Sequence, residues 1–166
     1  MHIVIVLLVI FAVWRGGGWS RFRQFHATML YIATMNLLYF YFTSDKPLWV
    51  FQSTIGIPEH VLDVLHAFIV LPCTVMIFLS NFPKALTGKI LLILKWVLIY
   101  VVLEYIGYHI GAIDYHNGWS IGWSILFVTV MFPMLRLHYT RPVTAYAFSV
   151  IIIAILLILF EVPWIH

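Results

Sequence analysis

Three ionisable side chains share one helical face at the start of an otherwise apolar stretch, Pro58 to Leu79. On a helix that advances by about 100° per residue, Glu59, Asp63 and His66 fall within a stripe roughly 60° wide. Ionisable residues are costly inside a bilayer, and they usually face a protein interior or a water-filled cavity rather than lipid. The stripe is therefore the first candidate site that the sequence offers.

Polar residues of four separate apolar runs come to similar depths. A rise of about 1.5 Å per residue places His66 roughly 6 Å, Asn36 about 4 Å and Glu104 at most about 6 Å to the outer side of the middle of their runs. Ser124 reaches a similar level, whereas Asp63 lies roughly 10 Å out. The agreement between four runs indicates a polar layer more strongly than any single residue does.

The residue types in this layer suit the binding of cations or protons. Asp63, His66 and Glu104 would supply the mixed oxygen and nitrogen ligands that Zn²⁺, Mn²⁺ or Fe²⁺ accept. The same groups would also form a proton relay along an outward-facing cavity. The spacing matches no metal motif such as HExxH, so the cofactor stays open, with a divalent metal ion as the candidate.

Other side chains would support this cluster. On the run that carries Glu104, Tyr100 and Tyr108 lie four residues to either side, so phenols flank the carboxylate on one helical face. A serine at the same depth as Glu104 and His66 would be the one arrangement that suggests hydrolysis. The supporting residues are Glu59, Asn36, Tyr108 and Ser124.

The polar layer thus predicts an integral membrane protein that binds or passes a small cation or proton. The alternative is a structural or partner-binding membrane protein, in which a buried hydrogen-bonded network joins helices without turnover. A third interpretation is an intramembrane metal-dependent enzyme, which would need a metal with an open coordination position.

Composition supports the membrane class. The 166 residues are 64% hydrophobic and only 9% charged, whereas soluble domains average about 45–50% apolar and 25% charged residues. The nine Lys and Arg residues are scattered among the ends of apolar runs, so nucleic-acid binding is not expected. The single cysteine, Cys73, excludes an intramolecular disulfide.

Six apolar runs predict an all-α polytopic bundle in one domain, because the runs lack the alternating pattern of membrane β-strands. The first run is short for a bilayer about 30 Å thick, so five spans are the alternative to six. A mixed segment, 47–57, is expected to lie at the membrane interface. The predicted spans are 2–14, 25–42, 60–79, 90–109, 119–135 and 143–162.

The basic residues predict the orientation. With six spans, every Lys and Arg except Lys46 falls on one side. By the positive-inside rule that side is cytoplasmic, and both termini face out. The basic residues on the cytoplasmic side are Arg15, Arg21, Arg23, Lys84, Lys89, Lys95, Arg136 and Arg141.

Several remaining features favour ordinary membrane roles. His2, His116 and His166 are expected to face solvent at the outer surface, and His138 belongs to the basic inner surface. Gly107 and Gly111 match a small-residue packing motif, though a turn is the preferred interpretation at this span end. Membrane lipid is the expected partner, with a homo-oligomer or another membrane protein as further possibilities.

Four features together resemble a family of small multi-pass membrane proteins of spore-forming bacteria. They are Pro58 with Asp63-x-x-His66, the carboxylate of Glu104, Asn117-Gly118-Trp119-Ser120, and Arg136 with His138-Tyr139 and Arg141-Pro142. That family has no established activity. The resemblance therefore implies a bacterial cytoplasmic membrane location and nothing about chemistry.

Overall fold

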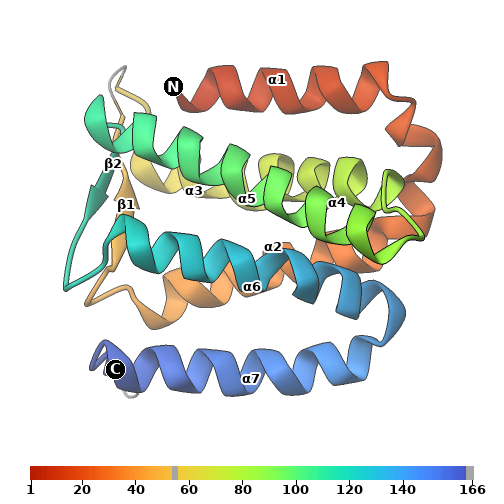
Figure 1. Ribbon diagram of the computed structural model, residues 1–166. Coiled ribbons are helices and arrows are strands. Elements are labelled where there is room, and N and C mark those ends of the chain that lie inside the picture. Colours follow the sequence, from red (N-terminus) through yellow and green to blue (C-terminus); the bar gives the residue numbers. More distant parts are fainter. Residues whose placement is uncertain (54–55, 164–166) are drawn as a thin grey trace.

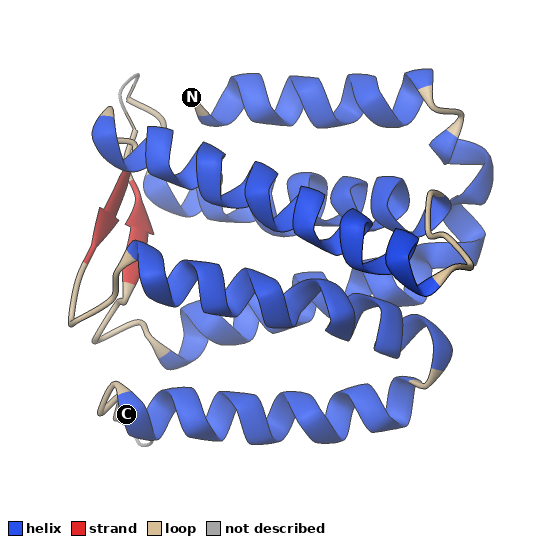
Figure 2. Ribbon diagram, viewed as in Figure 1, coloured by secondary structure: helices blue, strands red, loops and turns tan. Residues whose placement is uncertain are grey.

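The computed structural model describes residues 1–53 and 56–163, and it is a bundle of helices with one small sheet at one end (Figures 1 and 2). The all-α class predicted from the sequence is confirmed. Two positions of the predicted interfacial segment 47–57, residues 54–55, and the predicted solvent-facing His166 lie outside the described residues.

The chain begins with helix α1 (His2–Arg15), which is followed by a 3-10 turn, η1 (Gly18–Arg21), and helix α2 (Phe22–Phe42). Gly17 has a φ of 64°, a left-handed conformation that glycine adopts without steric cost. This residue lets the chain turn sharply between the helices, and α1 and the Gly18–Phe42 segment meet at a bend of 81°.

The stretch that carries Asp63 and His66 is one continuous helical segment, Glu59–Ser80. It consists of α3 (Glu59–Leu65), a π turn η2 (His66–Val70) and α4 (Leu71–Ser80). In the π turn the Leu71 amide bonds to the carbonyl of His66, five residues earlier. Pro72 follows directly and has no amide hydrogen to donate, a disruption that wide turns accommodate.

Three long helices complete the chain: α5 (Leu86–His109), α6 (Ile121–Thr140) and α7 (Pro142–Leu159). Together with Glu59–Ser80 they are the four described segments that are long and apolar enough to span a membrane. The α1 and Gly18–Phe42 pair would add a fifth if it forms one broken span. The fifth predicted run, 119–135, begins two residues later in the structure and continues to Thr140.

The segment predicted to lie flat at the interface instead contains a strand. β1 (Trp49–Phe51) pairs antiparallel with β2 (Ile113–Tyr115), and Trp49 lies opposite Tyr115. Backbone pairing satisfies the amide and carbonyl groups of both segments, which a single interfacial segment would leave to water. The sheet covers the ends of the helices, as Figure 1 shows.

Side-chain contacts show which helix ends lie at each end of the bundle. At the sheet end, His2 bonds to the carbonyl of Ala112, and Lys46 donates to the carbonyl of Phe160, so the first and last described helices both have one end there. At the other end, Arg21 donates to the carbonyl of Ser80. Figure 1 shows the N- and C-terminal marks on the same side as the sheet.

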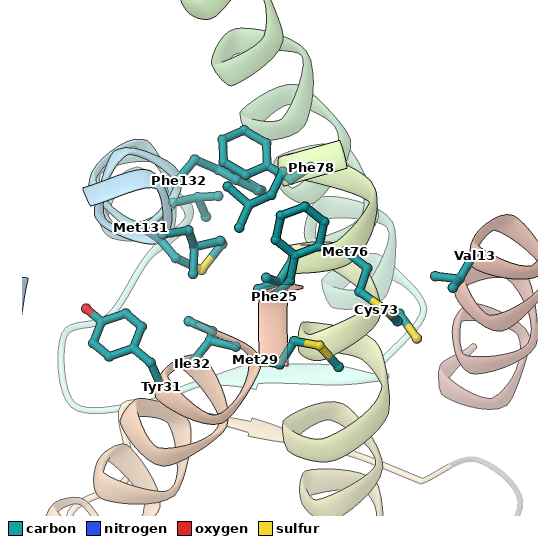
Figure 3. Packing of buried hydrophobic residues seen from close by; sticks show 14 residues of the cluster. Val13, Phe25, Met29, Tyr31, Ile32, Cys73, Met76, Phe78, Met131 and Phe132 are labelled. Carbon is teal, nitrogen blue, oxygen red and sulfur yellow. The ribbon is translucent and has the colours of Figure 1, made fainter. Parts of the chain in front are cut away.

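The main core lies between α2, α4 and α6. Phe78 and Phe132 are fully buried, and their ring centroids are 5.0 Å apart. Figure 3 shows these two rings next to each other, with Val13 of α1 reaching towards Cys73 of α4. The segment α3–α4 packs against α1 and α2, whereas α5 and α7 both pack against α6. This arrangement decides which polar residues can meet.

Candidate functional site

An apolar cavity of about 510 Å³ runs through the bundle. Its walls come from every long helix, and Trp49, Phe51 and Ile113 line it at the sheet end. Most lining side chains are aliphatic or aromatic, and the polar ones include Asn36, His66, Glu104 and Ser124. Four of the residues predicted from the sequence therefore border one interior space.

Glu104 is the centre of a hydrogen-bonded chain at the sheet end of α5. The Tyr115 hydroxyl donates to Glu104 Oε1 at 2.8 Å, and the Ser124 hydroxyl donates to the same oxygen. Trp119 Nε1 donates in turn to Ser124 Oγ at 2.9 Å. These hydrogen bonds connect α5, α6, strand β2 and the segment before α6. The structure thus brings together Glu104 and Ser124, which the sequence predicted to lie at the same depth.

Tyr115 contributes the phenol that contacts Glu104, a role that the sequence suggested for Tyr100 and Tyr108. Burial, together with the hydrogen bond to Glu104, raises the pKa of Tyr115 above its usual value, so the phenol remains protonated and acts as a donor near neutral pH. Tyr108 stacks on Tyr115 with ring centroids 4.8 Å apart. Tyr100 instead shares a hydrogen bond with Thr74.

Asn36 lines the cavity from α2, and its Oδ1 is buried without a hydrogen-bond partner among the described residues. One helical turn further along α2, the Tyr39 hydroxyl bonds to the backbone of Trp49, which lies opposite Tyr115 in the sheet. Asn36 thus lies about one helical turn along α2 from the residue that contacts β1. A buried amide oxygen without a partner is rare in proteins, and Asn36 Oδ1 can accept a hydrogen bond.

His66 lies in a second polar group, with His2 and Phe51. Its Nδ1 donates to the Leu62 carbonyl at 2.9 Å, and its ring lies 4.1 Å from that of Phe51 and 5.1 Å from that of His2. The expectation that His2 faces solvent is wrong, because His2 is only 4% exposed and donates to Ala112. The position of His2 in α1 gave no sign of this contact with a loop more than a hundred residues away.

The predicted metal ligands do not come together. Among the described residues, no group of three or more His, Cys, Asp or Glu side chains is placed to hold a metal ion. Glu59 is exposed and Asp63 is half-buried on α3, which packs against the π turn and β1, while Glu104 is on α5 and faces α6. The ligand set Asp63, His66 and Glu104 is therefore not supported.

A third polar group lies near the opposite end of the bundle. His138, expected at the inner surface, is only 4% exposed and shares a hydrogen bond with Thr28. The Tyr31 ring stacks on His138 at 4.2 Å, and its hydroxyl bonds to Ser149 at 2.7 Å. This group joins α2, α6 and α7 and has the character of a packing network.

Comparison of the chain with protein-family models, with curated proteins and with solved structures finds no match in any of the three. The fold and the site alone define the class, a helical protein of membrane type with an interior apolar cavity. Such a cavity with a few convergent polar groups is the usual form of a small-molecule site. The lining of this cavity suits a molecule with an apolar chain, and the few polar groups could orient the polar end of that molecule.

Proposed function

We propose that this protein is an integral membrane protein that binds one amphipathic molecule drawn from the bilayer. The apolar part of the molecule lies in the cavity, and its polar end lies near Glu104. The observation that carries this proposal is the mainly apolar cavity of about 510 Å³, with Glu104 and Ser124 among its few polar lining groups. Its volume falls within the range of about 300–1,000 Å³ that is typical of small-molecule sites.

The lining of the cavity suits a lipid-like occupant, because most of its side chains are apolar. Water is a poor filler for an apolar cavity, whereas a lipid-like chain is a good one. Leu126 and Ile155 line the cavity and are also exposed, which gives a chain access from the bilayer between α6 and α7.

The cation or proton function expected from the sequence has less support. It required Asp63, His66 and Glu104 to act together, and these side chains belong to separate groups. We therefore favour the amphipathic ligand over a cation, and membrane lipid is the partner class of this proposal.

The proposed topology has six spans, with the sheet end outside and the basic end in the cytoplasm of a bacterial membrane. α1 begins beside Ala112 and packs along η2 and α4, which supports counting it as a span. Arg21 and Lys84 lie at or near the opposite end, where the positive-inside rule places cytoplasmic loops.

Cysteine accessibility tests this topology. In a Cys73→Ser background, an impermeant thiol reagent is expected to label Ser44→Cys in intact cells and Lys84→Cys only after permeabilisation, because the two exposed positions lie at opposite ends. An N-terminal epitope should be accessible from outside. Labelling of Lys84→Cys in intact cells would invert the orientation, and an internal epitope would reduce the spans to five.

Ligand retention tests the function. Protein purified in a mild detergent is expected to carry close to one amphipathic molecule per chain, which native mass spectrometry would detect and solvent extraction would release. The released molecule should bind again to the stripped protein. Stripped and untreated samples of identical mass, with no uptake of added long-chain compounds, would contradict the proposal.

A further inference from the structure

We infer that the bound molecule is a single-chain amphipathic amine, whose ammonium group donates hydrogen bonds to the carboxylate of Glu104. This inference rests on the proposed function and specifies its ligand class. It depends on the charge of the cavity lining, on the hydrogen bonds that Glu104 already accepts, and on the kind of polar atom that the lining leaves without a partner.

Glu104 is the one carboxyl side chain among the described residues that line the cavity, and no Lys or Arg side chain accompanies it there. Its hydrogen bonds within the described chain come from two neutral hydroxyls, those of Tyr115 and Ser124. Buried carboxylates are normally paired, because an unpaired charge is costly away from water. A cationic ligand would therefore complete the site.

The hydrogen bonds around Glu104 leave one of its oxygens for a ligand. Trp119 Nε1 donates to Ser124 Oγ, so the Ser124 hydroxyl keeps its own proton to donate to Glu104 Oε1. The Tyr115 hydroxyl donates to the same oxygen. A carboxylate accepts on both oxygens, and an ammonium group has three N–H donors and no acceptor. An ammonium at Oε2 would also offset the desolvation of the buried carboxylate.

Two other side chains that line the cavity have a buried acceptor without a partner in the described chain. These atoms are Asn36 Oδ1 and His2 Nδ1. His2 Nε2 donates to the carbonyl of Ala112, so Nδ1 of the neutral ring has a lone pair to offer and no proton. No buried side-chain donor of the described lining lacks a partner in this way. The unmet hydrogen-bonding capacity of the cavity thus favours a polar end that donates.

Aromatic rings of the lining would add to the attraction of a cation. Trp119 and Trp123 both line the cavity, and Trp119 is joined to Glu104 through the hydroxyl of Ser124. The faces of indole rings attract ammonium groups that come within about 6 Å. A neutral hydroxyl lacks this attraction, so the rings favour an amine over an alcohol.

The same lining disfavours anionic lipids. A phosphate or carboxylate would be desolvated without a counter-charge from Lys or Arg, and it would lie in a cavity that already has an acidic group. A volume of about 510 Å³ suits a drug-sized molecule and is small for a lipid with two acyl chains. A single-chain amine fits both the charge and the space.

The test titrates stripped protein with three probes of equal chain length: a long-chain primary amine, the corresponding alcohol and the corresponding carboxylate. Binding is followed by native mass spectrometry near neutral pH, where a primary amine is cationic. We expect the amine to bind about tenfold more tightly than the alcohol, because hydrogen bonds to charged groups are stronger by roughly that factor. In Glu104→Gln, which removes the charge and keeps the shape, the ratio of amine to alcohol affinity should fall about tenfold.

Glu59→Gln is the matched control, because Glu59 is an exposed carboxylate that does not line the cavity. It should leave the ratio unchanged. All proteins are measured in one detergent, so unequal partitioning of the probes into micelles cancels when the ratios of two proteins are compared.

Tighter binding of the alcohol or the carboxylate than of the amine would overturn the amine assignment while the binding function stands. An unchanged ratio in folded Glu104→Gln would do the same. The first of these outcomes needs only the wild-type protein, so the inference is tested even if the variant does not fold. If none of the three probes binds, the proposed function itself fails.

Discussion

Val128→Trp is expected to abolish binding of the amphipathic molecule without unfolding the protein. Val128 lies on α6, lines the cavity and is only 3% exposed. A tryptophan side chain at this position extends into space that the ligand would occupy. In a tightly packed core such an enlargement costs about 1–3 kcal/mol, but a cavity of about 510 Å³ gives the ring room. Because Val128 also belongs to the main core, the stripped protein should lose at most about 1–3 kcal/mol of stability and remain folded.

The measurement compares ligand retention and thermal unfolding for the wild type, Val128→Trp and a matched control. Ile125→Trp places the same ring on the same helix, at a position that is 43% exposed and does not line the cavity. It should retain the ligand as the wild type does. Full retention in a folded Val128→Trp protein would mean that the ligand lies elsewhere, on the outer surface of the bundle.

Much of the fold follows from hydropathy alone. The six predicted runs each correspond to a helical segment, and their bounds differ from the observed ones by only a few residues at most ends. Spans are predictable because every backbone group in a bilayer must bond within its own helix, which leaves the hydrophobic length as the main variable. The same one-dimensional reasoning gave the depths of Glu104 and Ser124, which the structure joins.

The sequence could not predict in this way which helices lie next to one another. Depth along a helix says nothing about which helices are neighbours, and the expected meeting of His66 with Glu104 required η2 to lie against α5. In the structure α5 packs on α6, and His66 faces His2 and Phe51 instead. The contacts of residues between the long helices were harder still to predict. Tyr115 lies in a three-residue strand, which is too short to give a periodic signal, and its partner Trp49 is far away in sequence.

Replacing Glu104 should show whether its network stabilises the fold. Glu104→Leu removes the acceptor of two donors, Tyr115 and Ser124. A buried donor left without a partner costs about 1–3 kcal/mol, so we expect the loss of both bonds to cost roughly 2–6 kcal/mol. Glu104→Gln keeps an acceptor oxygen at the same distance from the backbone. This variant should lose no more than about 1 kcal/mol of unfolding free energy. Unfolding of the stripped protein in detergent would measure both values.

A second substitution separates the loss of a hydrogen bond from the loss of packing. In Glu104→Leu, the further change Tyr115→Phe removes a hydroxyl that has lost its acceptor, so the double variant should be about 1 kcal/mol more stable than Glu104→Leu alone. In the wild type, Tyr115→Phe should instead be destabilising, because there it breaks the bond to Glu104. The opposite signs follow only if the Tyr115 hydroxyl is bonded to Glu104 in the folded state. If Tyr115→Phe has the same effect in both backgrounds, the two side chains act independently, and the hydrogen bond between them does not stabilise the fold.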